Sequence, residues 1–288
     1  MRHLFSQRKL MVWIGMVLAV IVFSLLGSWL SPYDPYAISP LTRLKPPSFE
    51  HLFGTDNFGR DLFVRMALAV RISLGIGGSV TLIAGLIGLA IGLLCAWYRG
   101  LDQILMRVCD GLFAFPSLLL AIAIVGILGP NAGNVVLALS LVYVPSIARV
   151  IRAAAMVVKE KPFIDALRVQ GAGAQRIIWL HLLPNVISPF IVQVSWVFSM
   201  AILTEAALSF LGSGVPAPAP SLGNLLLEGK AVIFTAWWMT FFPGGAIVLL
   251  ILSLNVIGDT LRDHIEPALQ PLPARLLRRL KKEPQANE

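Results

Sequence analysis

The residues of this chain that could do chemistry are few, and their spacing points away from catalysis. No G-x-x-x-x-G-K-[ST] run occurs in the 288 residues, so the sequence lacks the loop with which P-loop proteins hold nucleotide phosphates. No combination of residues suggests a hydrolytic triad, and we interpret His181 as a helix-surface residue rather than a base. Cys95 and Cys109 have no histidine near them, which argues against a metal site. We therefore predict that the chain is not itself a catalyst and binds no cofactor or metal.

One acid, Glu205, lies inside a long apolar run. An acid within a membrane-spanning helix is costly and is commonly functional. Glu205 follows Pro189 by roughly 16 residues, or about 24 Å of helix at 1.5 Å per residue, which places it in the outer half of a membrane. Two interpretations stay open. Glu205 could bind a substrate amino group or a partner-chain cation in a translocation pathway, or it could make a structural hydrogen bond to a neighbouring helix or the outer loop.

A polar stretch at residues 165–185, DALRVQGAGAQRIIWLHLLPN, separates two long apolar runs. It predicts a short helix, a turn at Gly171 and Gly173, and a second, amphipathic helix that stops at Pro184. Proline lacks an N–H and disfavours helical geometry in the residue before it. Asp165, at the start of the first helix, would interact favourably with the helix dipole. Taken alone, the stretch also fits a solvated loop with an amphipathic surface helix.

The composition indicates which kind of secondary structure positions these residues. The chain is 57% hydrophobic and 13% charged, against about 25% charged residues in a soluble domain, and its mean hydropathy is +0.80. We predict an all-α integral membrane protein, because backbone groups in lipid must be satisfied within each segment. The apolar runs are too long, and alternate too little, for the strands of a membrane barrel. Six spans are expected at residues 10–30, 73–98, 106–128, 135–154, 188–211 and 237–261.

Details within the runs predict local contacts. The first run is too long for a signal peptide, and its exit at residues 31–35 lacks a small-x-small cleavage site, so we expect it to be retained. Gly88 and Gly92 are spaced for close helix packing. Asp110 is expected to pair with Arg107, three residues before it, and Pro116 to kink its helix.

The cations predict the orientation. With both ends of the chain inside, 17 of its 23 Lys and Arg residues lie in inner segments and 6 in outer ones. This is the bias of cytoplasmic loops, and it places residues 156–185 in the cytoplasm. We interpret the net charge of +8 as this topology signal, and we expect no nucleic-acid partner.

The outer loop contains a second motif, Gly54-Thr55-Asp56 followed by Gly59-Arg60-Asp61. Each acid can cap a helix start or pair with Arg60 or Arg65, and each glycine allows a tight turn. These properties favour a folded periplasmic cap over a substrate site.

Several stretches resemble the permeases of bacterial ABC importers. Asp165-Ala166-Leu167, Gly171 and Leu182-Leu183-Pro184 are similar to the cytoplasmic loop of that family, Glu-Ala-Ala, Gly and Ile/Leu-x-Leu-Pro, with Asp for Glu and Leu for the second Ala. The outer-loop motif and residues 209–224 and 254–263 resemble the dipeptide, oligopeptide and nickel branch, in particular its second, C-type membrane subunit.

The resemblance implies the rest of the machine. It implies a type I ABC-importer permease fold with both termini cytoplasmic, in the bacterial inner membrane. The implied partners are a second homologous permease subunit, two ATP-binding subunits that use ATP and Mg, and a periplasmic or lipid-anchored substrate-binding protein. The family carries peptides or related small solutes, including nickel complexes and glutathione. The residues that would couple to the ATP-binding subunit are Asp165, Ala166, Leu167, Gly171, Leu183 and Pro184.

This interpretation divides the chain into three parts. Residues 1–72 hold the first helix and the periplasmic loop, residues 73–268 form the permease domain, and residues 269–288 are a basic cytoplasmic tail. The alternative is a secondary transporter or channel subunit independent of ATP. Such a transporter would need several intramembrane charges or inverted repeats, and a channel would need a charged ring or carbonyl filter.

Overall fold

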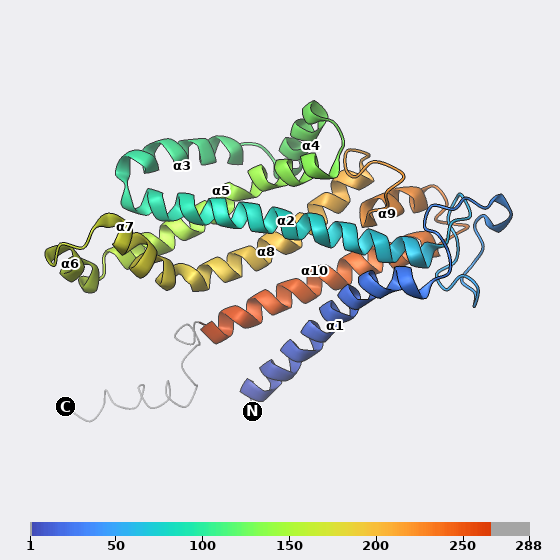
Figure 1. Ribbon diagram of the computed structural model, residues 1–288, viewed down its shortest axis with the longest axis horizontal. Helices are drawn as coiled ribbons and strands as arrows, with labels where there is room; N and C mark the ends of the chain where they lie inside the picture. The colour runs from blue at the N-terminus through green and yellow to red at the C-terminus, as the bar shows by residue number, and fades with distance from the viewer. Residues whose placement is uncertain (1, 266–288) are drawn as a thin grey trace, which may run out of the picture.

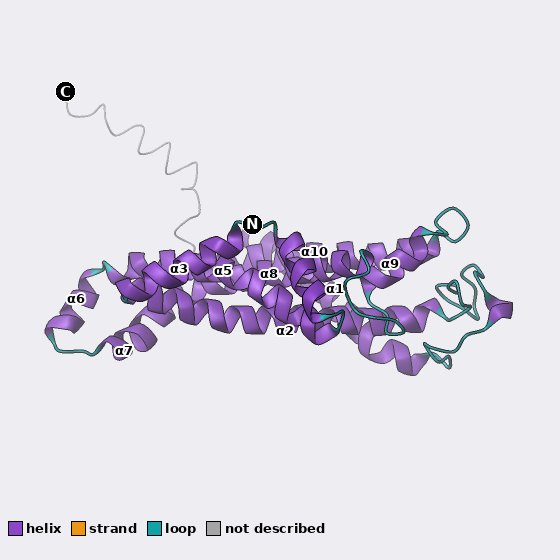
Figure 2. Ribbon diagram, turned by 90° about the horizontal axis from the view of Figure 1, so that it is seen from above, coloured by secondary structure: helices purple, strands orange, loops and turns teal. Residues whose placement is uncertain are grey.

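The computed structural model describes the backbone of residues 2–265 and the side chains of residues 11–261. Within that range every named element is a helix, and the only β pairing is an isolated bridge between Thr55 and Asp61. Figure 1 shows an elongated bundle, and Figure 2 shows long loops at the end opposite α6 and α7. The predicted basic tail, residues 269–288, lies outside the described residues.

Five of the described helices are long and apolar enough to cross a membrane. They are α1 (Arg2–Leu30), α2 (Leu62–Trp97), α5 (Ala132–Lys159), α8 (Leu183–Phe210) and α10 (Trp238–Ile265). Helices α3 (Arg99–Phe113) and α4 (Ser117–Leu128) pass the same test as a pair and meet at a bend of 93°. The described chain is thus all-helical, with six spans when the bent pair counts as one, as predicted.

The observed helices differ in their bounds from the predicted ones, most clearly in two cases. Helix α2 begins at Leu62, 11 residues before the predicted start, because the Asp61 carboxylate caps it by accepting the N–H of Val64 at 3.0 Å. The run expected to form one kinked helix at 106–128 is instead broken into α3 and α4. Pro116 lies at the N-cap of α4, where its missing N–H costs no helical hydrogen bond.

Helix α2 forms the centre of the bundle and packs closely on α5. A Cβ atom on Gly92 would lie 2.7 Å from the Cβ of Ile151, and one on Gly88 would lie 2.7 Å from the Cβ of Ile147. Distances this short exclude any side chain, so the two glycines let the helices approach. The close packing predicted from their spacing is confirmed.

The outer end of the bundle is closed by a network of ion pairs. The Asp56 carboxylate contacts Arg60 at 2.6 Å and Arg65 at 3.2 Å, and both arginines lie 3.1 Å from Glu228 of α9 (Leu222–Lys230). Asp61 caps α2 and accepts from His51 at 2.9 Å. The structural interpretation of the outer-loop motif is confirmed: its acids hold the loop between residues 31 and 61 onto α2 and α9.

The predicted pairing of Asp110 is wrong. Its carboxylate lies 2.7 Å from Arg149 of α5 rather than pairing with Arg107 on its own helix. A second pair between the same helices joins Asp102 to Arg152. These contacts hold α3 along α5. The acids of α3 therefore pair with arginines of a neighbouring helix and not with cations of α3 itself.

Candidate coupling and translocation sites

The polar stretch forms a tip that extends beyond the inner end of the bundle (Figure 1). It contains α6 (Pro162–Val169), a turn, α7 (Ala174–Ile177) and one π-helical turn, η2 (Ile178–Leu182), which continues into α8. Gly171 makes the turn with φ at +77°, a backbone conformation that residues other than glycine rarely adopt. The predicted helix and glycine turn are present.

The second helix of the tip does not stop at Pro184. Residues 174–210 form one continuous helical run, and Pro184 lies in the first turn of α8. The π turn explains this, because the N–H of Leu183 donates to the carbonyl of Ile178, five residues earlier. A local widening of this kind accommodates a proline within a helical run. The tip is therefore joined directly to a membrane-spanning helix.

The residues predicted to couple fall into two groups. Asp165, Ala166, Gly171 and Pro184 are exposed, whereas Leu167 and Leu183 are half-buried against the core. Asp165 lies in the first turn of α6, as expected, and pairs with Arg168 at 3.0 Å. The first group presents a surface to solvent, and the second holds that surface in place.

Sequence reasoning missed one feature of this surface. The side chain of Val169, the last residue of α6, is 89% exposed, and Phe163 is 40% exposed. An apolar residue two positions before the glycine of a predicted turn could have indicated it, because few residues at such a turn are available to cover the side chain. The tip thus exposes apolar side chains together with the charged Asp165 and Arg168, and protein contacts combine apolar and polar groups in this way.

The tip is fastened to α2 through Trp97. The Lys159 ammonium donates to the carbonyl of Ala96 at 2.8 Å and lies 5.4 Å from the centre of the Trp97 ring. The Arg168 guanidinium lies over the same ring at 5.0 Å. Cations at a helix C-terminus and over an indole face are both favourable. The sequence alone indicates these cations only as topology signals.

Glu205 is completely buried between α8, α2 and the start of α9. Its carboxylate accepts hydrogen bonds from Ser73 at 2.7 Å and from Ser209 at 2.8 Å. Ser221 supplies a third hydroxyl, and the Ser73 hydroxyl also accepts the N–H of Leu222 at 3.4 Å. Of the two interpretations of Glu205, this geometry favours the structural one, a hydrogen bond to a neighbouring helix and the outer loop.

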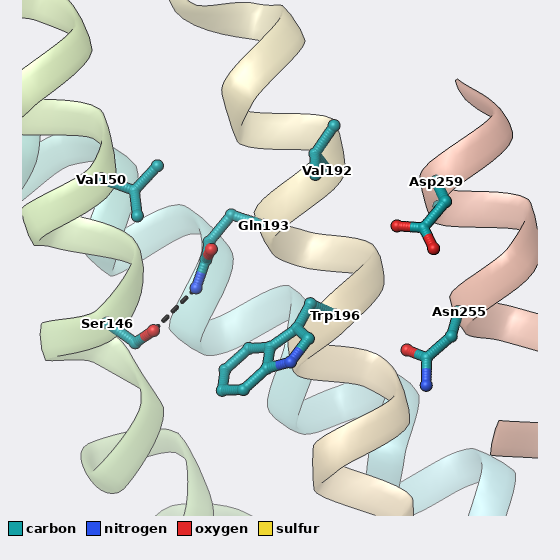
Figure 3. A pocket seen from close by; sticks show the side chains of 8 residues that line it. Ser146, Val150, Val192, Gln193, Trp196, Asn255 and Asp259 are labelled. Carbon is teal, nitrogen blue, oxygen red and sulfur yellow. Dashed lines mark hydrogen bonds between the residues drawn. The ribbon is translucent and has the colours of Figure 1, made fainter. Parts of the chain in front are cut away.

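A pocket of about 430 Å³ lies between α5, α8 and α10, closer to the inner end of the bundle. Figure 3 shows its side chains. The Gln193 amide donates to the Ser146 hydroxyl at 2.7 Å, and Trp196, Asn255 and Asp259 complete the larger part of the lining. Sequence reasoning had not singled out this set, because its members are contributed by three helices that are far apart along the chain.

Comparison with known proteins identifies the fold and its class. Residues 88–271 match the family described as the binding-protein-dependent transport system inner membrane component. The chain belongs to this family. It is a multi-pass inner-membrane permease subunit of an ABC transporter, which works with ATP-binding and substrate-binding components.

Relatives from several bacteria align with the permease over almost its whole length. This chain is 44% identical over 269 residues to a protein of Brucella suis biovar 1 that is named as a peptide transport system permease. The alignment covers 93% of this chain and 91% of that one. It is 41% identical over 277 residues to the dipeptide transport system permease protein of Escherichia coli, covering 93% and 92%. The glutathione transport system permease protein of Pectobacterium atrosepticum is 40% identical over 256 residues, with 88% and 85% covered.

A solved structure supports the fold. The permease superposes on a chain of the MetNI methionine ABC transporter, determined in an inward-facing conformation, with a TM-score of 0.58. The match covers 72% of this chain and 97% of that one at 18% identity. The type I ABC-importer fold expected from the cytoplasmic loop is thus confirmed.

Proposed function

We propose that this permease is half of the membrane channel of an ATP-driven importer for peptides. The observation that carries the proposal is the set of relatives, at 40% identity and above, named for peptides, dipeptides and glutathione. The proposed assembly contains a second, homologous permease subunit, two ATP-binding subunits and a substrate-binding protein. The permease holds no nucleotide itself, and its partners bind and hydrolyse ATP with Mg.

The exposed tip is the proposed contact with an ATP-binding subunit. Asp165, Ala166 and Gly171 present its surface, and the continuous run from α7 to α8 provides a rigid connection to the membrane. When the ATP-binding subunits close on ATP, the tip moves with them. Helix α8 and, through Trp97, helix α2 then carry the motion to the outer end. The result is alternating access of the pathway to the two sides of the membrane.

A glycine pair in the same turn tests this assignment. Gly171 has φ at +77° and Gly173 has φ at −68°, and a Cβ atom on either would meet nothing within 4 Å. Gly171→Val therefore strains the turn, at roughly 1–2 kcal/mol for a left-handed residue, whereas Gly173→Val leaves it unstrained. We expect Gly171→Val to lower binding-protein-stimulated ATP hydrolysis and peptide uptake roughly tenfold and Gly173→Val to retain both.

The measurement is made on the complete complex, co-expressed from neighbouring genes and reconstituted with its binding protein. Normal coupling in Gly171→Val would contradict the role of the tip. Transport by the permease alone, in liposomes without ATP, would overturn the proposal and favour a secondary transporter.

A further inference from the structure

The pocket between α5, α8 and α10 is lined by polar side chains of membrane-spanning helices, with Asn255 half-buried and Asp259 exposed near the inner end of α10. Asn255 and Asp259 belong to the apolar span Trp238–Leu261, and Gln193 lies in the span Ala174–Phe210. Carboxylates and amides within spanning helices face the protein interior or a water-filled cavity rather than lipid. This face of the bundle therefore borders water or another protein.

Two of these polar groups have no partner among the side chains at 11–261. The Gln193 amide is engaged by Ser146 at 2.7 Å. By contrast, the Asp259 carboxylate and the Asn255 amide make no hydrogen bond or ion pair with those residues. Figure 3 shows both side chains directed from α10 toward α8. They differ in this respect from Glu205, whose carboxylate is satisfied by serines of its own chain.

The lining defines the chemistry of a ligand. A carboxylate that has no partner among the described side chains, here Asp259, selects a cation that can donate hydrogen bonds. An indole, here Trp196, adds attraction for an ammonium group on its face. The Asn255 and Gln193 amides can each donate and accept, which matches the N–H and C=O groups of a peptide bond. A volume of about 430 Å³ lies within the range of small-molecule pockets, about 300–1,000 Å³.

We propose that this pocket binds the positively charged amino terminus of a peptide in transit, with Asp259 as the counter-ion of the ammonium group. The inference rests on the proposed function as a peptide importer and adds a substrate-binding position within the membrane. Asp259 contacts the ammonium group, Trp196 lies beside it, and the amides hold the first peptide bond. A lipid with an ammonium head group shares this chemistry, so the test must separate the two sources.

Tryptophan fluorescence of the complete transporter provides the test, with the transporter in nanodiscs of phosphatidylglycerol, without binding protein and without ATP. The probes are L-alanyl-L-alanine and its N-acetyl derivative, which lacks the positive charge. We expect saturable binding of the free dipeptide and at least tenfold weaker binding of the acetylated one. The fluorescence change should disappear in Trp196→Phe, which locates the signal in this pocket.

Variants then test the counter-ion. Asp259→Asn should weaken binding of the free dipeptide about tenfold and leave that of the acetylated one unchanged. Glu50→Gln, an exposed carboxylate of the outer loop, is the matched control and should bind as the wild type does. The comparison of the two probes on the wild-type protein needs no variant, so it stands even if Asp259→Asn fails to fold.

Several outcomes would overturn the inference. Equal affinity for the two probes, or an unchanged affinity in Asp259→Asn, excludes Asp259 as the counter-ion. A signal that vanishes when phosphatidylethanolamine is added to the nanodiscs assigns the pocket to a lipid head group. Absence of binding in a preparation that imports the dipeptide with ATP and binding protein removes this inference alone. Absence of that import removes the proposed function and the inference with it.

Discussion

Glu205 is an acid in a position where burial alone would be costly, and its neighbours explain how it is tolerated. A carboxylate that accepts several hydrogen bonds loses less on leaving water than an isolated one. Ser73 and Ser209 each donate to it from under 3 Å, and Ser73 also accepts the first N–H of α9. The acid therefore joins two spanning helices to the outer helix α9. This structural role explains why an acid lies in an apolar run, without any ligand.

Replacement of Glu205 separates a structural role from a substrate-binding one. Glu205→Gln keeps the size and one acceptor, and a serine hydroxyl can turn to accept from the new amide. We expect peptide uptake within about twofold of the wild type, a change of under 1 kcal/mol. Glu205→Ala leaves a cavity and removes the carboxylate to which Ser73, Ser209 and Ser221 donate, and we expect a loss of about 2–5 kcal/mol of stability.

The measurement compares uptake by the reconstituted complex with the thermal stability of each variant in detergent. A Glu205→Gln protein that is as stable as the wild type but no longer transports would restore the substrate-binding interpretation.

At the scale of the elements, the contact between α2 and α5 depends on the absence of two side chains. A Cβ atom on Gly92 would lie 2.7 Å from Ile151 and 2.8 Å from the carbonyl oxygen of Ala148, and a backbone atom cannot move aside cheaply. We expect Gly92→Ala to destabilise the permease by about 1–3 kcal/mol, the usual cost of overpacking.

Gly78 of the same helix is the matched control, because a Cβ atom there would meet nothing within 4 Å. Gly78→Ala should stabilise the helix by about 0.5–1 kcal/mol. The midpoint of thermal unfolding in detergent checks both variants, and equal shifts for the two would contradict the packing argument.

The link between the cytoplasmic tip and α2 also belongs to this scale. Trp97→Ala removes the ring that both Lys159 and Arg168 contact. Since each of the two contacts contributes about 0.5–1 kcal/mol, we expect uptake per ATP hydrolysed to fall roughly five- to twenty-five-fold while the ATP-binding subunits still copurify. Tyr98→Ala, an exposed aromatic one residue later, is the control and should couple normally. Loss of the ATP-binding subunits in Trp97→Ala would show that the residue forms the tip instead of linking it.

Across the whole molecule, the sequence predicted those features that a single segment determines by itself, such as a membrane span. Apolar length located the spans, and the Lys and Arg bias oriented them. It missed the first 11 residues of α2 because Arg65 interrupts the apolar run, and the Glu228 that neutralises it is 163 residues away. It located the bend at Pro116 but missed the first seven residues of α3 for the same reason, since Arg152 of α5 holds the charge of Asp102 there. The pocket needs three helices at once, so no single stretch could indicate it.

Orientation is a property of the whole chain, and it can be measured at three positions. Cys95 and Cys109 are buried, and replacing both with alanine gives a cysteine-free protein. Single exposed cysteines can then be introduced into it. Glu50→Cys lies in the outer loop, Gln175→Cys on the tip and Gly100→Cys in the first turn of α3, and all three positions are exposed. With more cations in the inner segments, an impermeant maleimide should label only Glu50→Cys in spheroplasts, and only the other two in inverted vesicles.

The inverted vesicles also test the contact with the partner. If the tip lies in a cleft of an ATP-binding subunit, that subunit should slow labelling of Gln175→Cys. If binding of the subunit leaves Gln175→Cys accessible to the maleimide for only one-tenth of the time, the free energy of the contact is about 1.4 kcal/mol. We therefore expect labelling to be at least tenfold slower. Gly100→Cys, on the same side but outside the tip residues 162–182, should react at an unchanged rate. Equal protection of both positions would mean general shielding by the subunit, and protection of neither would place the coupling contact elsewhere on the inner surface.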